Sequence, residues 1–300
     1  MALGMYAAIL MRPFGSLVGL YRSLMSASLA AQRVSELTWN PPLAAPMAAA
    51  PARRLDAGVE MRHVSFSYTD KRPILRDVSL VVPPGQTVAL MGANGSGKST
   101  LLKLLADYYG DYAGEVRFAD VELRRWDLDT YYRNIAVVWG QNHFFQGTII
   151  ENCQLDSQSD GQEVPEVAAA LGCDEWIRSL DDGYATRIGY GGAALSSGES
   201  HKLALVRALV KNPPILLVDE LSSCLDPRSE QRVLEGLEAM RPPDGITIVV
   251  THKMDVARHP LMDRIVVLSG GHLVESSQPA AAGGIGGLMN QAQAELAGPS

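Results

Sequence analysis

Nine consecutive small and polar residues form the stretch of this sequence best suited to chemistry. They fit the spacing GxxxxGK[ST] and stand between an apolar run, TVALM, and a helix predicted over 99–107. Glycines let backbone N–H groups surround phosphate oxygens, and a helix N-terminus adds its dipole. The lysine can reach the β- and γ-phosphates, and the serine hydroxyl can bind Mg²⁺. We therefore predict a nucleoside triphosphate site at Gly92, Ala93, Asn94, Gly95, Ser96, Gly97, Lys98, Ser99 and Thr100.

An acidic pair follows a second apolar run. In PPILLVDE, residues 213–220, a predicted strand delivers Asp219 and Glu220 to its carboxyl end, where ligands bind in open α/β sheets. Asp219 is suited to orient Mg²⁺ through its water shell, and Glu220 to polarise an attacking water. Acidic residues after a strand are also common as turn or cap residues. The phosphate loop favours a shared mononucleotide site.

A third motif, ALSSGESHKLALVRALV at 194–210, opens a predicted helix. Ser196 followed three residues later by Glu199 is the pattern of a capping box, in which each side chain satisfies a backbone N–H at the helix start. The same helix end is also suited to bind an anion. The two interpretations are compatible, because both use one helix N-terminus.

Together these motifs resemble the ATP-binding cassette (ABC) family. LSSGE stands where the family carries its signature, usually LSGGQ, some twenty residues before the acidic pair. Ser196 and Gly198 match, whereas Ser197 replaces a glycine and Glu199 replaces the usual glutamine. The resemblance implies that Ser196, Gly198 and Glu199 of one subunit cap the ATP that the phosphate loop of another subunit holds.

The resemblance also assigns three single residues. Tyr68, in VSFSY, occupies the adenine-stacking position, although it could equally be an ordinary strand aromatic. Asp226 ends LSSCLD, which is similar to the D-loop that crosses the family's dimer interface. His252, in IVVTHK, matches the switch histidine that contacts the γ-phosphate; a lone histidine is otherwise often a capping or buried residue. These roles rest on the resemblance.

One loop departs from the family pattern. The family's Q-loop glutamine follows an apolar strand and precedes GTIxEN by a fixed distance. In IAVVWGQNHFFQGTIIEN, ungapped matching puts Gly140 in its place and Gln141 one step later. Either the loop has lost a residue and Gln141 still reaches Mg²⁺, or the contact is weakened. We favour Gln141, because its amide can supply the oxygen.

Composition indicates a globular chain from a reducing compartment. Its 300 residues, 47% hydrophobic and 20% charged, suit one large domain or two modest ones. The net charge of −7 gives no support to nucleic-acid binding through a basic surface. Cys153, Cys173 and Cys224 lie far apart without a CxxC or Cys/His spacing, so we expect neither a disulfide nor zinc.

The order of the elements predicts an α/β fold, a P-loop NTPase core with a mixed β-sheet, a helical signature-bearing subdomain and an N-terminal helix. Several β-rich runs are continuously apolar, as in strands covered on both faces. We place the ABC ATP-binding domain at 58–275, with the helical subdomain at about 142–204 and further helices at 163–171, 200–211 and 228–240. A Pro/Ala-rich linker spans 39–57, and a flexible tail spans 276–300.

Residues 1–38 predict a helix, but no stretch reaches the roughly 18 charge-free apolar residues of a membrane span. Periodicity alone allows an amphipathic helix or the lower part of a membrane helix. GTIIEN and YATRIGYGGAALSSGE resemble the exporter type, whose ATPase follows a membrane domain in one chain. That resemblance implies that 1–38 is the end of the last transmembrane helix. The preceding helices are then either encoded separately or missing because the reading frame is truncated or misassigned.

The resulting prediction is an ATP-binding and ATP-hydrolysing subunit or fragment of an ABC exporter at the cytoplasmic face of the inner membrane. Its expected cofactors are ATP and Mg²⁺. Its expected partners are a second ABC ATPase domain and a transmembrane domain, with no nucleic acid. The alternatives are an ATP-gated dimerising module with weak hydrolysis and a soluble non-transport ABC ATPase. The expected catalytic residues are Glu220, His252 and Lys98, and the expected Mg²⁺ ligands are Ser99, Gln141 and Asp219.

Overall fold

A computed structural model describes residues 58–69, 73–155, 161–221 and 224–274. The chain divides into two compact units, 1–47 and 48–300, and all described residues belong to the second. The predictions for the N-terminal helix, the linker and the tail therefore lie outside the described residues. Within the described part of the chain, no helix has both the length and the apolar content needed to cross a membrane.

A sheet of six strands forms the centre of the described residues, in the order β12-β11-β3-β10-β9-β6. All neighbours in it run parallel except β12, which is antiparallel to β11. The central strands β3, β9 and β10 are buried at every position, as their continuous apolar sequences predict. The strands are β3 (Thr87–Met91), β6 (Ile135–Val138), β9 (Ile215–Asp219), β10 (Ile246–Val250), β11 (Arg264–Ser269) and β12 (His272–Val274).

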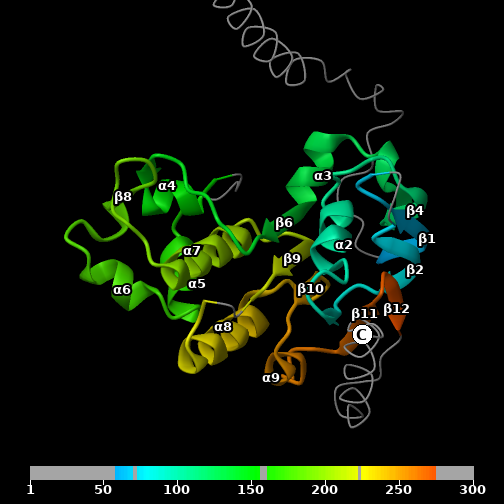
Figure 1. Ribbon diagram of the computed structural model, residues 1–300. Helices are drawn as coiled ribbons and strands as arrows, with labels where there is room; N and C mark the ends of the chain where they lie inside the picture. Colours follow the sequence, from blue (N-terminus) through cyan, green and yellow to red (C-terminus); the bar gives the residue numbers. More distant parts are fainter. Residues whose placement is uncertain (1–57, 70–72, 156–160, 222–223, 275–300) are drawn as a thin grey trace, which may run out of the picture. The chain divides into compact units, whose positions relative to one another are not determined.

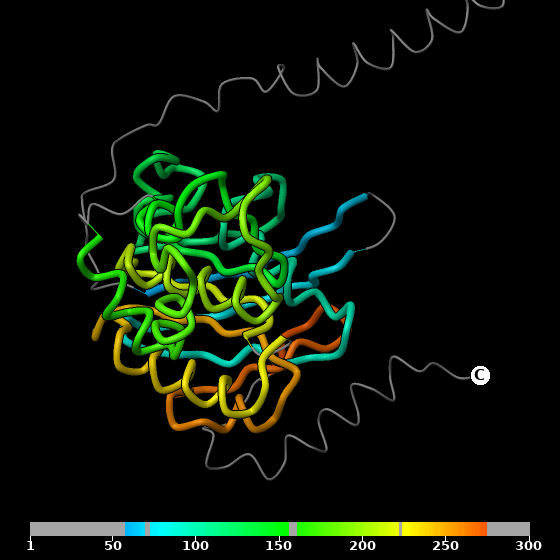
Figure 2. The backbone as a smooth tube through the Cα atoms, turned by 90° about the vertical axis from the view of Figure 1, so that its left-hand side faces the viewer, coloured from blue at the N-terminus to red at the C-terminus, as the bar shows by residue number. Residues whose placement is uncertain are grey.

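An antiparallel sheet in the order β2-β1-β4-β5 accompanies it (Figure 1). Its strands are β1 (Val59–Phe66), β2 (Leu75–Val82), β4 (Ala113–Phe118) and β5 (Val121–Glu122). The ends of β1 and β2 project from one side of the molecule in Figure 2. The register of β1 against β2 shifts on either side of Val64, and alternate residues along β2 are buried. This sheet therefore has one face in the core and one toward solvent.

Helices α4, α5 and α6 gather on the other side of the molecule, and α7 connects them to the sheet (Figure 1). Two-residue strands β7 (Gly147–Thr148) and β8 (Arg187–Ile188) pair there. Helices at 99–107, 163–171, 200–211 and 228–240 are confirmed with small shifts of their ends. The helices are α2 (Lys98–Leu105), α3 (Leu128–Asn134), α4 (Ile149–Cys153), α5 (Val164–Ala170), α6 (Asp174–Ser179), α7 (Ser197–Val210), α8 (Pro227–Met240) and α9 (Met254–Ala257), with 3₁₀ turns at Leu123–Arg125 and Gly183–Ala185.

Alternate residues of β3 belong to two different hydrophobic clusters. Val88 and Leu90 pack in the cluster that includes the antiparallel sheet and α2, whereas Ala89 and Met91 pack in the cluster that includes α4, α5 and α7. Successive side chains of a strand point to opposite faces, so the sheet has a core on each side. This arrangement confirms the predicted α/β fold class.

Candidate nucleotide-binding site

The phosphate loop joins the carboxyl end of β3 to α2, and its backbone requires glycine. Gly92 has φ 151° and Gly97 has φ 107°, which are conformations that side chains rarely adopt. A Cβ on Gly92 would lie 2.3 Å from the carbonyl oxygen of Leu268. Ala93 and Asn94 lie at the turn between these glycines and are partly or fully exposed. The loop therefore has the tight, accessible backbone that the motif predicts.

Lys98 folds back over this loop. Its Nζ donates to the carbonyl oxygens of Gly92, at 2.9 Å, and Ala93, at 2.8 Å. Burial lowers the pKa of Lys98, and the charges of Asp219 and Glu220 counteract that effect. The ammonium group thus lies beside the loop backbone and in the field of the acidic pair. From that position it can exchange its carbonyl partners for phosphate oxygens.

The first turn of α2 contacts the end of β9. The Ser99 hydroxyl hydrogen-bonds to the Asp219 carboxylate, and this bond counteracts the burial that raises the pKa of Asp219. Within the described residues, Asp219 Oδ1 and the Ser96 hydroxyl are buried without a hydrogen-bond partner. Buried polar atoms normally have partners, so an unsatisfied carboxylate oxygen and a hydroxyl beside a phosphate loop fit a missing polar ligand.

Strand register explains how distant residues meet at this edge of the sheet. Val218 pairs with Val138 on β6, Asp219 pairs with Val250 on β10, and Val250 also pairs with Leu90 on β3. Two residues beyond Val138, Val218, Val250 and Leu90 come Gly140, Glu220, His252 and Gly92, respectively. A Cβ on Gly140 would lie 3.8 Å from Glu220 Oε2. The four segments that the sequence indicated therefore end together.

Glu220 and His252 occupy this edge with exposed side chains. Glu220 has φ 62°, in the left-handed region that is costly for a residue with a Cβ. The backbone of Thr251, next to His252, donates to the Leu90 carbonyl oxygen at 3.2 Å. Gln141 is exposed as well, and Gly140 is the residue of its loop that approaches Glu220. The geometry leaves the choice between Gly140 and Gln141 as a prediction.

Tyr68 lies just after β1 and contacts α2, the helix that follows the phosphate loop. Its hydroxyl lies 2.9 Å from the Thr100 hydroxyl, and the residue is 48% exposed. Phe66 and Tyr109 meet its ring at steep angles, with centroids 5.1 and 5.4 Å away. An accessible aromatic ring beside the first turn of α2 suits stacking against a planar base.

The signature region forms the predicted capping box at the start of α7. The Ser196 N–H donates to Glu199 Oε2 at 2.7 Å, and the Glu199 N–H donates to the Ser196 hydroxyl at 3.2 Å. The Glu199 carboxylate is thus turned back onto its own helix. Gly198 packs against the D-loop, because a Cβ there would lie 3.1 Å from the Cys224 carbonyl oxygen. Asp226 caps α8 by accepting from the N–H groups of Arg228 and Ser229.

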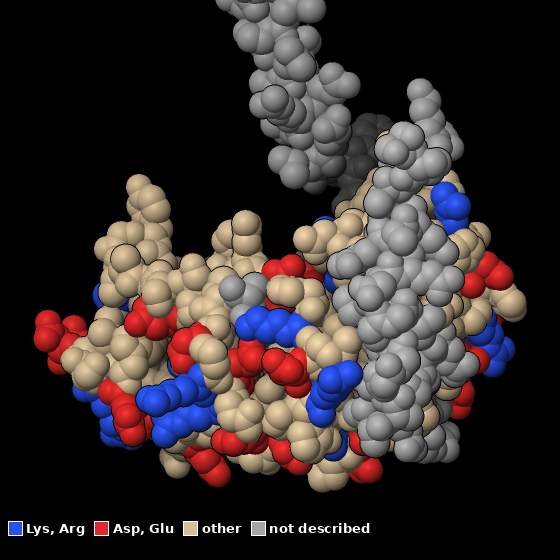
Figure 3. All heavy atoms as spheres, turned by 60° about the horizontal axis from the view of Figure 1, so that its bottom comes forward, with Lys and Arg blue, Asp and Glu red and all other residues tan. Residues whose placement is uncertain are grey.

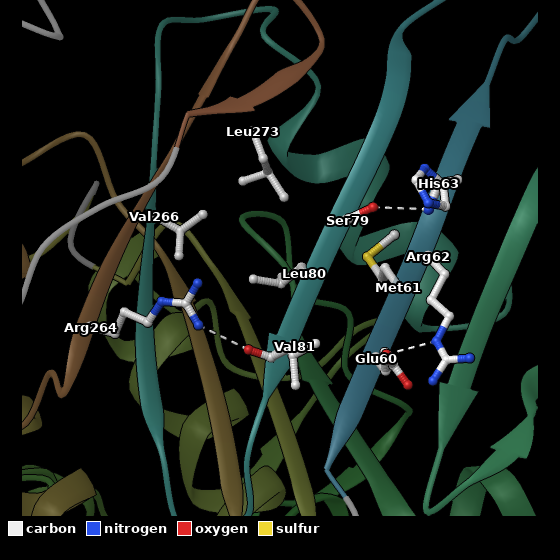
Figure 4. Close-up of a pocket in the computed structure, with 10 residues that line it drawn as sticks. All are labelled: Glu60, Met61, Arg62, His63, Ser79, Leu80, Val81, Arg264, Val266 and Leu273. Carbon is white, nitrogen blue, oxygen red and sulfur yellow. Dashed lines mark hydrogen bonds and ion pairs between the residues drawn. The ribbon is translucent and has the colours of Figure 1, made fainter.

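A groove beside the β1–β2 sheet is a different feature. The groove, of about 510 Å³, lies between β1, β2, β11 and β12. Figure 4 shows the residues that line it, with Arg62 and Glu60 paired at its edge. None of the predicted nucleotide-site residues is among those that line it. In Figure 3, Lys, Arg, Asp and Glu are interspersed on the face shown. Because the predicted nucleotide-site residues do not line this groove, the candidate nucleotide site lies at the loops described above.

Two features escaped the sequence reasoning. A second groove, of about 520 Å³, is lined by Ala106, Tyr108, Asp129, Tyr132, Arg133, Ile135, Val137, Trp139 and Lys211. The Tyr108 and Trp139 rings of this groove meet edge to face, with centroids 5.4 Å apart. Trp139 directly precedes Gly140. The other feature is His201, buried on α7. The closely spaced aromatics at 108–109, 131–132 and 139 were the available signal for the groove.

Comparison with known proteins places the chain in a family. The family profile described as "ABC transporter" matches residues 75–223. The chain is 35% identical over 303 residues to the "Multidrug efflux ATP-binding/permease protein" of Mycobacterium bovis (strain BCG / Pasteur 1173P2), covering 98% of this chain and 25% of that protein. It is 37% identical over 223 residues to the "ATP-dependent lipid A-core flippase" of Syntrophus aciditrophicus (strain SB), covering 74% of this chain and 36% of that protein.

A solved structure gives the same result. "Structure of a bacterial Atm1-family ABC exporter with ATP bound" matches with a TM-score of 0.78 and 30% identity, covering 98% of this chain and 52% of that one. The chain belongs to the ABC transporter family and contains the family's ATPase domain, related to those of ABC exporters. It spans between 17% and 38% of the length of the most similar curated relatives.

Proposed function

We propose that this chain binds and hydrolyses ATP to power export through a membrane domain, at the cytoplasmic face of the inner membrane. The observation that carries the proposal is the convergence of Lys98, Ser99, Asp219 and Glu220 at the carboxyl edge of one sheet. The relatives whose names join ATP-binding and permease parts support the coupling to transport. The transported substrate stays open, because this chain spans a minor part of those relatives.

The phosphate loop binds the triphosphate. Its N–H groups and the start of α2 surround the phosphate oxygens, and Lys98 places its charge on the β- and γ-phosphates. Tyr68 stacks on the base. The oxygen donors Ser99 and Asp219, with the unsatisfied Asp219 Oδ1, suit Mg²⁺, which prefers oxygen ligands and keeps several waters. When bound there, with Gln141 as a further ligand, Mg²⁺ neutralises phosphate charge.

Glu220 acts as the general base. It accepts a proton from the attacking water as the water oxygen bonds to the γ-phosphorus. The bond from the γ-phosphorus to the bridging oxygen breaks, and ADP leaves with that electron pair. His252 donates a hydrogen bond to a γ-phosphate oxygen while the negative charge redistributes over the phosphates. These roles require both side chains to reach the solvent-facing edge, where both are exposed.

A second copy of the ATPase domain completes the site. The hydrogen bonds of Ser196 with Glu199 satisfy its own helix, while Ser197 is exposed and Gly198 is half-buried at the start of α7. Ser196 and the backbone at Gly198 therefore bind the γ-phosphate of ATP held by the partner, with Glu199 facing away. This sandwich makes two ATP molecules shared ligands of two chains.

The dimer is testable in Glu220→Gln, which keeps the shape of the site and removes the base. ATP is expected to trap a dimer of this variant, visible by size-exclusion chromatography with light scattering. Adding Ser196→Arg is expected to abolish the dimer and leave ATP binding to the monomer nearly unchanged. A persisting dimer, or loss of monomer binding as well, would mean that LSSGE serves its own helix alone.

The membrane domain is the second partner. The groove lined by Tyr108, Tyr132 and Trp139 offers exposed aromatic surface, with Tyr108 58% and Tyr132 40% exposed. Aromatic residues are enriched at protein interfaces. Trp139 precedes Gly140, so a helix end docked in this groove would move the loop that meets Glu220. Trp139→Ala is expected to reduce co-purification with the cognate membrane domain, whereas Val81→Ala, exposed on β2, should not.

Membrane association is expected to depend on the N-terminal segment. The 300-residue chain should sediment with membranes, and a chain beginning at Ala57 should stay in the supernatant. If both distribute equally, residues 1–37 do not anchor the protein.

The altered Q-loop favours one alternative function. With Gly140 beside Glu220, the chain would be an ATP-gated dimerising module with weak hydrolysis if Gln141 fails to reach Mg²⁺. Steady-state phosphate release by the unmodified protein distinguishes this weakly hydrolysing module from an ATPase that powers export.

A further inference from the structure

The loop between β6 and β7 is held by side chains rather than by backbone pairing. Among the described residues, no backbone–backbone hydrogen bond involves residues 141–145. That segment begins with Gln141, the proposed Mg²⁺ ligand, and directly follows Gly140, which approaches Glu220. Because the backbone of the segment does not pair, the side chains that bond to it determine where Gln141 lies.

Asn152 of α4 makes the first set of these bonds. The Phe145 N–H donates to Asn152 Oδ1 at 2.9 Å, and Asn152 Nδ2 donates to the Phe145 carbonyl oxygen at 3.0 Å. Nδ2 also donates to the carbonyl oxygen of Thr148, the residue that caps α4. Asn152 is 2% exposed, so these bonds are shielded from water. The amide therefore pairs with Phe145 as a neighbouring strand would.

Arg207 of α7 makes the second set. Its Nε donates to the Asn152 carbonyl oxygen at 2.8 Å, and its Nη2 donates to Asn152 Oδ1 at 3.1 Å. Its Nη1 donates to the His143 carbonyl oxygen at 3.1 Å, and its guanidinium carbon lies 4.7 Å from the centroid of the Phe144 ring. A planar guanidinium can bond several oxygens and stack on an aromatic face together. This one side chain thus joins the loop, α4 and α7.

The position of Arg207 connects two parts of the proposed function. His143, which it holds, lies two residues after Gln141. Arg207 itself lies in the last turn of α7, the 14-residue helix that begins at the capping box of Ser196. The helix that presents Ser196 to the partner's ATP therefore also carries the side chain that holds the loop of the chain's own site.

We propose that Arg207 is a positioning residue for Gln141, acting with Asn152 by fixing the backbone of residues 143–145. The inference rests on the proposed role of Gln141 as a Mg²⁺ ligand and identifies what holds that ligand in place. It concerns the position of the loop and the rate of turnover, whereas the phosphate loop binds ATP separately.

Hydrogen exchange of the nucleotide-free protein measures the position of the loop directly. Arg207→Met keeps an unbranched side chain and removes its hydrogen-bond donors. The Phe145 amide should then exchange about tenfold faster, because loss of bonds from a charged donor makes local opening easier. Mass spectrometry with fragmentation to single residues measures this rate.

Arg178→Met is the matched control. Arg178 of α6 also donates to oxygens, those of the Asp174 carboxylate at 2.8 and 2.9 Å, and its guanidinium carbon lies 5.9 Å from the centroid of the Tyr184 ring. These contacts join α6 to the 3₁₀ turn after it rather than to the loop. Arg178→Met should leave Phe145 exchange unchanged and keep kcat within about twofold.

Turnover tests whether Arg207 acts through Gln141. Arg207→Met should lower kcat for phosphate release about five- to tenfold, because small misplacements reduce catalysis, and should leave KM for ATP within about twofold. Combined with Gln141→Ala, it should lower kcat no further than Gln141→Ala does alone, since the group that it positions is gone. If Arg207→Met fails to fold, Arg207→Lys replaces it, because an ammonium cannot bond all three oxygens.

The outcomes separate this inference from the function on which it rests. Unchanged Phe145 exchange in Arg207→Met would overturn its role in holding the loop. Full turnover in Arg207→Met, or losses that multiply in the double variant, would overturn its action through Gln141 and leave hydrolysis by Glu220 intact. Full turnover in Gln141→Ala would refute both the Mg²⁺ role of Gln141 and this inference. Undiminished turnover in Glu220→Gln would instead refute the proposed general base.

Discussion

The phosphate loop and the signature both lie at the start of a helix, but their polar groups are satisfied in opposite ways. At the start of α2, side chains from two segments converge, and within the described chain the Ser96 hydroxyl and Asp219 Oδ1 lack partners. At the start of α7, Ser196 and Glu199 satisfy each other. The first region has polar atoms available to a ligand. In the second, the side chains satisfy their own helix, and we propose that the ligand of its remaining N–H groups is ATP held by another chain.

The largest expected effect is the loss of turnover when the general base is removed. Glu220→Gln should lower phosphate release by about 10²–10⁴-fold and retain ATP binding, because the amide keeps the shape of the carboxylate. Lys98→Ala is the contrasting variant. It should weaken MgATP binding by about ten- to a hundredfold, since it removes a charged hydrogen-bond donor from the phosphates. Full steady-state hydrolysis by Glu220→Gln would show that Glu220 is not the general base.

The next effect concerns the loop between β6 and α4. Gln141→Ala should lower turnover by about tenfold if Gln141 supplies an oxygen to Mg²⁺. Gly140→Ala should change it little, because the added Cβ would lie at an ordinary 3.8 Å from Glu220 Oε2. Phosphate release by both variants measures the difference. Equal, small effects would favour the weakly hydrolysing module.

Labelling of the natural Cys224 thiol measures whether the start of α7 becomes covered, without introducing another cysteine. It is exposed in the D-loop next to Gly198, whereas Cys153 and Cys173 are buried, and burial raises the pKa of each of these two thiols to about 12. In Glu220→Gln, ATP should slow maleimide labelling of Cys224 about tenfold, because the partner covers it. Mass spectrometry locates the label, and Cys224→Ser is the control. Unchanged labelling in the presence of ATP would argue against an interface there.

The smallest effect lies at the far end of α2. Burial raises the pKa of Asp107 from 3.8 to about 6, partly opposed by Arg124. The folded state therefore binds this proton more tightly, so its contribution to stability is complete below about pH 4 and is lost as pH rises through 6. Asp107→Asn should be more stable than the unmodified protein by about 1 kcal/mol at pH 8 and no different at pH 4.

Urea unfolding at the two pH values measures this prediction. Asparagine also tolerates the left-handed φ of 56° at this position. Asp111→Asn, on the nearby surface, is the control and should change stability little. Equal stability of Asp107→Asn and the unmodified protein at pH 8 would contradict the shifted pKa.

The sequence predicted what depends on neighbouring residues. The phosphate loop, the strand before Asp219 and the capping box of Ser196 and Glu199 are local patterns, and the structure contains each. Contacts between strands were not predictable, because they depend on strand order. Gly140 meets Glu220 because β6 pairs with β9, and that pairing is not encoded locally.

Mixing two inactive variants tests most directly that each ATP site is built from two chains. Lys98→Ala damages the phosphate loop, and Ser196→Arg damages the signature, so each alone should hydrolyse ATP near background. A mixed dimer pairs the intact loop of one with the intact signature of the other. An equimolar mixture should recover activity that neither variant has alone, up to about a quarter of the unmodified rate, which is the value for random pairing with half of the dimers mixed and one complete site in each. A mixture that stays at background although mixed dimers form, or full activity of Ser196→Arg alone, would contradict the shared site.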